Sequence, residues 1–334
     1  MRRDHLVPNV YPPIIPILGP LEAGTTQRHL VTLPGAALRD APRPVTTVTG
    51  ATPGPTLFIN AGVHGGEYPA VETVIRLGTR LDAAQISGTV VLMPVLNLPA
   101  FWQRSMFVCP VDNVNPNRVF PGDPQGTYSE QMVHALLNEF IVHADAYIDL
   151  HGGDIPEALV PFTICRRGNE PADAKAMELA RVFGLPYLLT VDRPIQRAKG
   201  SSSYVAAAER GIPAILAEAG GVGQLQHDAV ALLTDGIERV LAHLGMRETT
   251  VPAAPPPTVL TSFECLYTQH AGMFYPSVAA DDEVRAGQEI GRIGSLFGET
   301  LETITSPVTG RVLFLTINPA VLANGLLIGI GVAA

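Results

Sequence analysis

Residues 56–77 read TLFINAGVHGGEYPAVETVIRL. The apolar run 57–59 leads into a turn that contains three glycines. From Ala70 to Leu77, apolar and polar residues then recur with the spacing of a helix. The pattern predicts a buried strand, a glycine-rich turn and the start of a helix.

His64 and Glu67 lie three residues apart on this turn. An imidazole nitrogen and a carboxylate oxygen are both good zinc ligands, and this spacing lets them reach one ion from a short piece of backbone. Gly65 and Gly66 would allow a tight bend between them. The His-x-x-Glu pattern also arises often by chance, and a catalytic zinc usually has three protein ligands. The prediction therefore requires a further ligand elsewhere in the chain.

Two other apolar runs end in the same way. Residues 146–153, AYIDLHGG, end a predicted strand with His151, and residues 214–221, AILAEAGG, end one with Glu218. Ligands bind at the carboxyl ends of strands in parallel sheets, so we expect these side chains to meet His64 and Glu67. Two histidines and a carboxylate then form a zinc site with one open position, and Glu218 is the candidate general base. Asp149, on the same strand face as His151, could orient that imidazole or bond nearby backbone.

Composition narrows the class of protein. The chain has 334 residues, 46% hydrophobic and 16% charged, enough for a large core and about two domains. The net charge of −9 and the lack of a basic block argue against nucleic-acid binding. Three widely spaced cysteines form no disulfide pattern, and we expect reduced thiols in a cytoplasmic protein. We expect neither a secretory signal nor a membrane span.

The order of the predicted elements indicates the architecture. Apolar runs such as VVLMPV, residues 90–95, alternate with helical patterns, which predicts an α/β fold with a mixed, largely parallel sheet flanked by helices. Residues 97–126 are predicted to form a long, functional loop. VPAAPPP, residues 251–257, is typical of a semi-rigid linker, and short strands follow it. We expect a hydrolase domain in residues 1–250 and a small all-β domain in 251–334. The SPVTGRV motif at 306–312 resembles lipoyl-like barrel-sandwich modules, but that part has no lysine to carry a lipoyl group.

Four stretches resemble the succinylglutamate desuccinylase/aspartoacylase family of the zinc carboxypeptidase clan: NAGVHGGE (60–67), NPNRVFPG (115–122), IDLHG (148–152) and AEAGG (217–221). Their order and spacing match across most of residues 50–245. The resemblance implies a zinc carboxypeptidase-like fold and one zinc ion per chain, held by His64, Glu67 and His151. It also implies that Glu218 acts as base and proton shuttle.

The same resemblance implies how the substrate is held. Asn117 and Arg118 would bind its carboxylate, a role that suits the forked guanidinium group. A further family arginine polarises the scissile carbonyl, and Arg104 is our candidate because it is the only arginine between residues 81 and 117. A salt bridge within the loop is the alternative for Arg104. A family tyrosine also contacts substrate, and Tyr267 and Tyr275 are both candidates.

The predicted function is that of a zinc-dependent amidohydrolase. It would remove an acetyl- or succinyl-type acyl group from an N-acylated amino acid or a related carboxylate-bearing amide. A zinc carboxypeptidase acting on peptides would use the same ligands, and a non-catalytic zinc- or ligand-binding protein is the other alternative. The presence of Glu218 argues against a non-catalytic protein, because structural zinc sites normally have four protein ligands. The acyl group, the amine, the metal in vivo and the role of the β-domain stay open, as does the oligomeric state, a homo-oligomer included.

Overall fold

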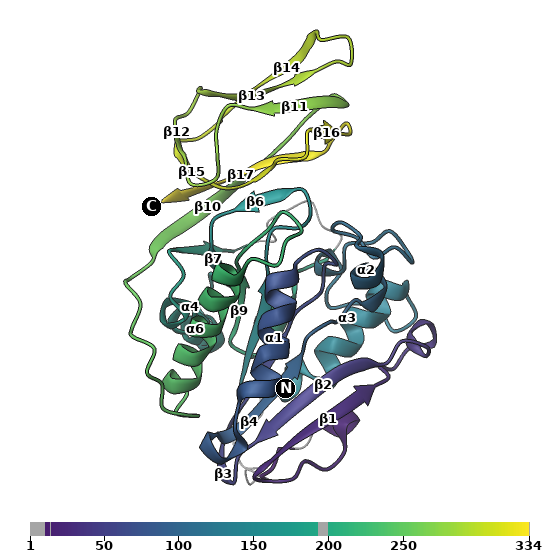
Figure 1. The fold of residues 1–334 in the computed structure, drawn as a ribbon, viewed down its shortest axis with the longest axis vertical. Coiled ribbons are helices and arrows are strands. Elements are labelled where there is room, and N and C mark those ends of the chain that lie inside the picture. Colours follow the sequence, from purple (N-terminus) through teal and green to yellow (C-terminus); the bar gives the residue numbers. More distant parts are fainter. Residues whose placement is uncertain (1–10, 14, 193–199, 334) are drawn as a thin grey trace.

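The computed structural model describes residues 11–13, 15–192 and 200–333. Thirteen of its strands form one large sheet and four form a smaller antiparallel sheet (Figure 1). In spatial order, the large sheet contains β1 (Thr25–Val31), β2 (Arg43–Thr49), β4 (Ser87–Met93), β3 (Thr52–Asn60), β5 (Ala146–His151), β9 (Ala214–Glu218), β7 (Phe162–Arg166), β8 (Tyr187–Val191), β10 (Thr258–Tyr267), β17 (Leu326–Ala333), β15 (Gly310–Thr316) and β12 (Glu283–Val284), with β6 (Glu157–Leu159) paired to β15. The smaller sheet contains β14 (Thr300–Thr305), β13 (Glu289–Gly294), β11 (Gly272–Pro276) and β16 (Ala320–Val321).

Helices cover both faces of the large sheet. They are α1 (Tyr68–Arg80), α2 (Leu98–Gln103), α3 (Tyr128–Glu139), α4 (Pro171–Phe183), α5 (Ser203–Glu209) and α6 (His227–His243). Figure 1 shows α1, α4 and α6 on one face, and α1 and α4 each contact α6. The alternation of side chains along a strand divides the core. Phe58 belongs to the cluster that includes residues of α3 and α5, whereas Leu57 and Ile59 belong to the cluster of α1, α4 and α6.

The central strands are parallel. β4, β3, β5 and β9 run side by side in one direction, while β1, β2 and β7 add antiparallel pairs. This confirms the predicted mixed, largely parallel sheet with flanking helices. The register places His151 opposite Glu218 and Asn60 opposite Asp149. The three carboxyl ends therefore meet at one edge of the sheet, as expected for a ligand site.

Short helices interrupt the predicted loop at 97–126, so that prediction was partly wrong. Asn97 caps α2 by accepting a hydrogen bond from the amide of Ala100, and Pro99 lies in the first turn, where its missing amide proton costs nothing. A single 3-10 turn, η4 (Pro116–Arg118), follows in the same segment.

The described elements from Thr258 onward are all strands. Four of them form the smaller sheet, whereas β10, β12, β15 and β17 belong to the large sheet, because β10 pairs parallel with β8 and β6 pairs with β15. A third hydrophobic cluster, which includes Phe274 and Ile328, lies among these strands. The division of the chain at residue 251 stays a prediction. In the part of the chain that the structure describes, no helix has the length and hydrophobicity needed to cross a membrane.

Candidate active site

The turn after β3 is packed closely by its neighbours. A Cβ atom on Gly65 would lie 2.1 Å from the carbonyl oxygen of Ala100, and one on Gly66 would lie 2.3 Å from Oδ1 of Asp154. Neither glycine has a positive φ. These residues are therefore glycines because other segments approach the turn, and not because it bends in a left-handed conformation. The contacts hold His64 and Glu67 in place.

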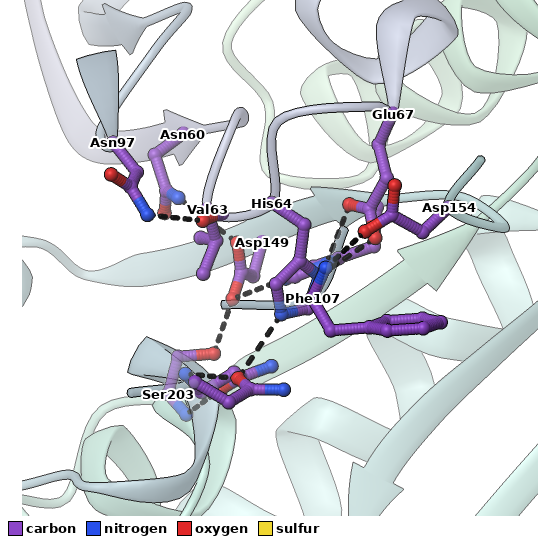
Figure 2. A network of polar contacts seen from close by, with 12 residues as sticks. Asn60, Val63, His64, Glu67, Asn97, Phe107, Asp149, Asp154 and Ser203 are labelled. Atoms are coloured by element: carbon purple, nitrogen blue, oxygen red, sulfur yellow. Dashed lines mark hydrogen bonds and ion pairs between the residues drawn. The ribbon is translucent and has the colours of Figure 1, made fainter. Parts of the chain in front are cut away.

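His64, Glu67 and His151 converge as predicted. Nδ1 of His64 lies 2.7 Å from Oε1 of Glu67, and Nδ1 of His151 lies 2.9 Å from Oε2 of the same carboxylate. One ligand atom from each residue lies within 4.8 Å of the others, and all three side chains are buried. Figure 2 shows His64 and Glu67 facing each other across the turn. This is the spacing in which three donors can share one ion.

Polar partners fix the far side of each imidazole. Nε2 of His64 lies 3.1 Å from Oδ1 of Asn115, and Nε2 of His151 lies 3.1 Å from Oδ2 of Asp149. Both rings therefore turn Nδ1 toward Glu67. A carboxylate or amide behind a ligand histidine is the usual arrangement in metal sites, because it sets the tautomer and the ring orientation.

Asp149 is itself held by a buried chain of hydrogen bonds (Figure 2). The amide of Asn60 donates to Oδ1 of Asp149 at 2.9 Å, and the hydroxyl of Ser203 donates to Oδ2. The hydroxyl of Tyr147 donates to Oδ1 of Asn60 at 2.6 Å. Two strands and a helix thus fix the carboxylate behind His151. No pattern in the sequence indicated a role for Ser203, which lies 54 residues from Asp149.

The electrostatics of the cluster favour positive charge. Burial alone would raise the pKa of Glu67, but His64 and His151 outweigh it and hold the pKa at about 2. Burial alone would lower the pKa of His151, but the carboxylates of Asp149 and Glu67 raise it well above its usual value. The ionised carboxylates of Glu67 and Asp149 thus stabilise a positive charge in a buried place, and a metal cation could supply that charge instead of protons on the imidazoles.

The donor set fits a zinc ion. Oε2 of Glu67 is buried and makes no hydrogen bond of normal geometry within the described residues, although Nδ1 of His151 lies 2.9 Å from it. A buried carboxylate oxygen in this state is costly unless an ion or a ligand binds it. Two imidazoles and a carboxylate are also the ligand types of known catalytic zinc sites.

The cluster lines a cavity of about 660 Å³. Glu218, Asn117, Arg118 and Tyr267 line it with the cluster. The C-terminal strands and loops supply another part of the wall, including Phe263, Phe314, Thr316, Asn318, Val321, Leu322, Asn324 and Leu326. Segments about 200 residues apart in the sequence therefore enclose one space.

Glu218 ends β9 beside this cluster. Burial, with the nearby carboxylate of Glu67, raises its pKa well above the usual value, and only His151 among the stronger influences lowers it. Oε2 of Glu218 is buried and has no hydrogen-bond partner in the described part of the chain. A carboxyl group with a raised pKa in a cavity has the properties of a general base.

Asn117 and Arg118 follow on η4. Oδ1 of Asn117 accepts a hydrogen bond of 2.9 Å from the amide of Ser203, and Nη1 of Arg118 donates to the Asn117 carbonyl at 2.8 Å. Burial lowers the pKa of Arg118, while Tyr204, Tyr267 and Glu218 act in the opposite direction. An arginine guanidinium keeps its proton in proteins, so Arg118 can receive an anionic group.

The structure separates the remaining candidates. Arg104 is exposed at the C-terminal end of α2, with φ of +55°, and it is not among the residues that line the cavity. Its predicted contact with substrate therefore gains no support from its position. Tyr275 is 41% exposed and packs on Arg292 with a cation–π distance of 4.2 Å. Tyr267 lines the cavity, so it is the better candidate of the two tyrosines.

Comparisons with known proteins agree with this geometry. Residues 53–244, more than half of the chain, match the succinylglutamate desuccinylase/aspartoacylase catalytic domain. The chain is 29% identical to N-alpha-acetyl-L-2,4-diaminobutyric acid deacetylase of Halomonas elongata over 256 residues, which cover 75% of this chain and 73% of that protein.

Two solved structures extend the comparison. One is a succinylglutamate desuccinylase/aspartoacylase from Rhodobacter sphaeroides, with a TM-score of 0.81 and 26% identity over 92% of this chain and 95% of that one. The other is the ectoine utilization protein EutE (DoeB) from Ruegeria pomeroyi, which shares the fold with a TM-score of 0.83 and 22% identity over 94% and 97%. This chain belongs to the succinylglutamate desuccinylase/aspartoacylase family.

Proposed function

We propose that the protein is a zinc-dependent deacylase that hydrolyses the amide bond of an N-acylated amino acid. The observation that carries the proposal is the convergence of the His64–Glu67–His151 cluster, Glu218 and Arg118 on one cavity. Family membership supports it, and so does the curated relative, which removes an acetyl group from an amino acid derivative.

His64, Glu67 and His151 would hold the zinc ion. When bound, the ion would supply Lewis acidity, which polarises the acyl carbonyl and lowers the pKa of water. Asp149 and Asn115 hold the two imidazoles with Nδ1 toward the ion. These contacts fix the ligands before substrate arrives.

The remaining side chains have separate tasks. Arg118, with Asn117, binds the carboxylate of the amino acid, so that the acyl amide lies beside the His64–Glu67–His151 cluster. Glu218 accepts a proton from the attacking water and returns it to the leaving amine as the C–N bond breaks. The products are a carboxylic acid and an amino acid with a free amine. Tyr267 contacts the bound substrate from the C-terminal wall.

A substrate screen tests the proposal. Purified protein loaded with zinc is incubated with N-acetyl and N-succinyl amino acids and, in parallel, with peptides that have free C-termini, and amine release is measured. We expect turnover of acyl amino acids and loss of turnover after chelation. Faster cleavage of peptides would indicate a carboxypeptidase, and bound zinc without any turnover would indicate a binding protein. The three free cysteines, of which Cys109 and Cys165 are buried, are consistent with the cytoplasmic location that we propose.

A further inference from the structure

Glu157 brings a second carboxylate into the cavity, and the mechanism above does not use it. It begins β6, a strand of three residues that pairs with β15. Glu157 and Leu159 both line the cavity, whereas Ala158 between them packs against the cluster of the C-terminal strands. Since alternate residues of a strand point to opposite sides, the Glu157 side chain faces the cavity.

Glutamates outnumber arginines and lysines among the described residues that line the cavity. Arg118 is the only arginine or lysine among the described lining residues, against the acids Glu67, Glu157 and Glu218. Glu67 is engaged by two imidazoles, and Glu218 is the proposed base. Glu157 forms no ion pair within residues 11–13, 15–192 and 200–333. Its charge is therefore available to a ligand.

The surroundings of Glu157 oppose its negative charge. Burial, together with the carboxylates of Asp154 and Glu67, raises the pKa of Glu157 to about 7. A cation placed beside it would favour the ionised form and lower the cost of that charge. An anionic group in the same place would add a further repulsion.

We propose that Glu157 receives a protonated amine of the substrate, so that the preferred substrates are N-acylated diamino acids. The inference rests on the proposed deacylase function and names the substrate class. Arg118 would bind the α-carboxylate, and Glu157, on the C-terminal side of the same cavity, would bind the side-chain ammonium group. N-acyl derivatives of aspartate and glutamate would be poor substrates, because their second carboxylate would face Glu157.

Matched substrates test this assignment. The cationic substrates are Nα-acetyl-2,4-diaminobutyrate, Nα-acetylornithine and Nα-acetyllysine, and the neutral partners of equal length are Nα-acetylnorvaline, Nα-acetylnorleucine and Nα-acetyl-2-aminoheptanoate. We expect the parent enzyme to prefer the cationic member of the best pair by at least about tenfold in kcat/KM. In Glu157→Gln, which keeps the shape of the side chain, this ratio should fall to about one. The kcat/KM for the neutral member should change less than about threefold.

Glu299→Gln is the matched control, since Glu299 is exposed on the β13–β14 hairpin and the substitution removes the same charge. It should keep the parent ratio. Calorimetric binding of the product pair, ornithine against norleucine, gives a second readout if Glu157→Gln turns over slowly. An unchanged ratio in Glu157→Gln, or a parent enzyme that prefers neutral or anionic substrates, would overturn the assignment and leave the deacylase function standing. Failure of the parent to hydrolyse any acyl amino acid would overturn both.

Discussion

At position 218, burial decides the chemistry of a single carboxyl group. The pKa of Glu218 is raised because burial disfavours its charge, and Glu67 and Glu157 add to this effect. An ordinary surface glutamate is too weak a base for efficient proton transfer at neutral pH, whereas a buried one can both accept and return a proton. The same residue on the surface would have no such function.

Replacing Glu218 by Gln tests this role. The amide keeps the shape of the side chain but cannot take a proton, so kcat should fall by about 10²–10⁴-fold. The zinc content should stay at the parent level, because Glu218 is not among the three clustered ligands. Single-turnover rates and metal analysis of the same preparation provide the measurement. A variant that turns over at the parent rate would refute the base assignment.

The raised pKa of Glu157 predicts that the free energy of unfolding depends on pH. The pKa of Glu157 is raised from 4.5 in the unfolded chain to about 7 in the folded protein. The folded state thus binds the proton more tightly, so the stability contributed by this group is complete below pH 4.5. It is lost as the pH rises through 7. Measured on metal-free protein by urea denaturation, Glu157→Gln should gain up to about 3 kcal/mol relative to the parent between pH 5 and pH 8. A difference that does not change with pH would contradict the shift, and Glu299→Gln controls for the loss of one charge.

The residues of the site differ in how far sequence could predict them. His64, Glu67, His151 and Glu218 each end or follow an apolar run beside glycines, and these local patterns were sufficient to place them together. No local sequence pattern marks Glu157 or Ser203, because their roles depend on segments that are brought near them only when the chain folds. Arg104 was predicted because it is the only arginine between residues 81 and 117. That fact does not show whether its side chain points toward the cavity.

At the scale of elements, β5 connects the sheet to the site. Its alternation puts Asp149 and His151 on one face, which the sequence predicted. Its register with β3 and β9 then brings Asn60 beside Asp149 and Glu218 beside His151. The helix predicted from the spacing of residues 70–77 is also present, as α1, which begins at Tyr68. The six-residue helix α2 was missed, because so short a helix depends on one cap and on packing against Gly65.

The position of Asp149 on β5 predicts its effect on metal binding. Asp149→Asn removes the charge behind His151, so the Kd for zinc should rise about 10–100-fold. Competition with a chromophoric chelator gives the Kd. Asp145→Asn is the control, because Asp145 is exposed just before the same strand and accepts a 2.7 Å hydrogen bond from the amide of Thr56, away from the site. Equal losses in the two variants would show that the effect is one of strand stability and not of ligand orientation.

For the whole molecule, the cavity depends on segments that lie far apart in the chain, from His64 to Leu326. Strand pairing between β8 and β10 and between β6 and β15 carries the C-terminal strands to the site. Sequence analysis predicted these strands but placed them in a separate domain whose role stayed open, apart from a substrate contact by Tyr267 or Tyr275. A parallel pairing of two strands that are separated by the 66 residues between Val191 and Thr258 leaves no local pattern, so sequence alone could not choose between Tyr267 and Tyr275.

That choice gives the last prediction. Tyr267 lines the cavity about 150 residues after Arg118 in the sequence, whereas Tyr275 lies on the smaller sheet against Arg292. If the Tyr267 hydroxyl contacts substrate, Tyr267→Phe should lower kcat/KM about 10–100-fold, the range for a lost hydrogen bond to a charged group. Tyr275→Phe removes the same atom and should leave kcat/KM within about twofold of the parent. Steady-state kinetics on the best substrate from the screen, with melting temperatures to confirm folding, separates the two. A loss of activity only in Tyr275→Phe would mean that the C-terminal strands approach the cavity differently in the working enzyme.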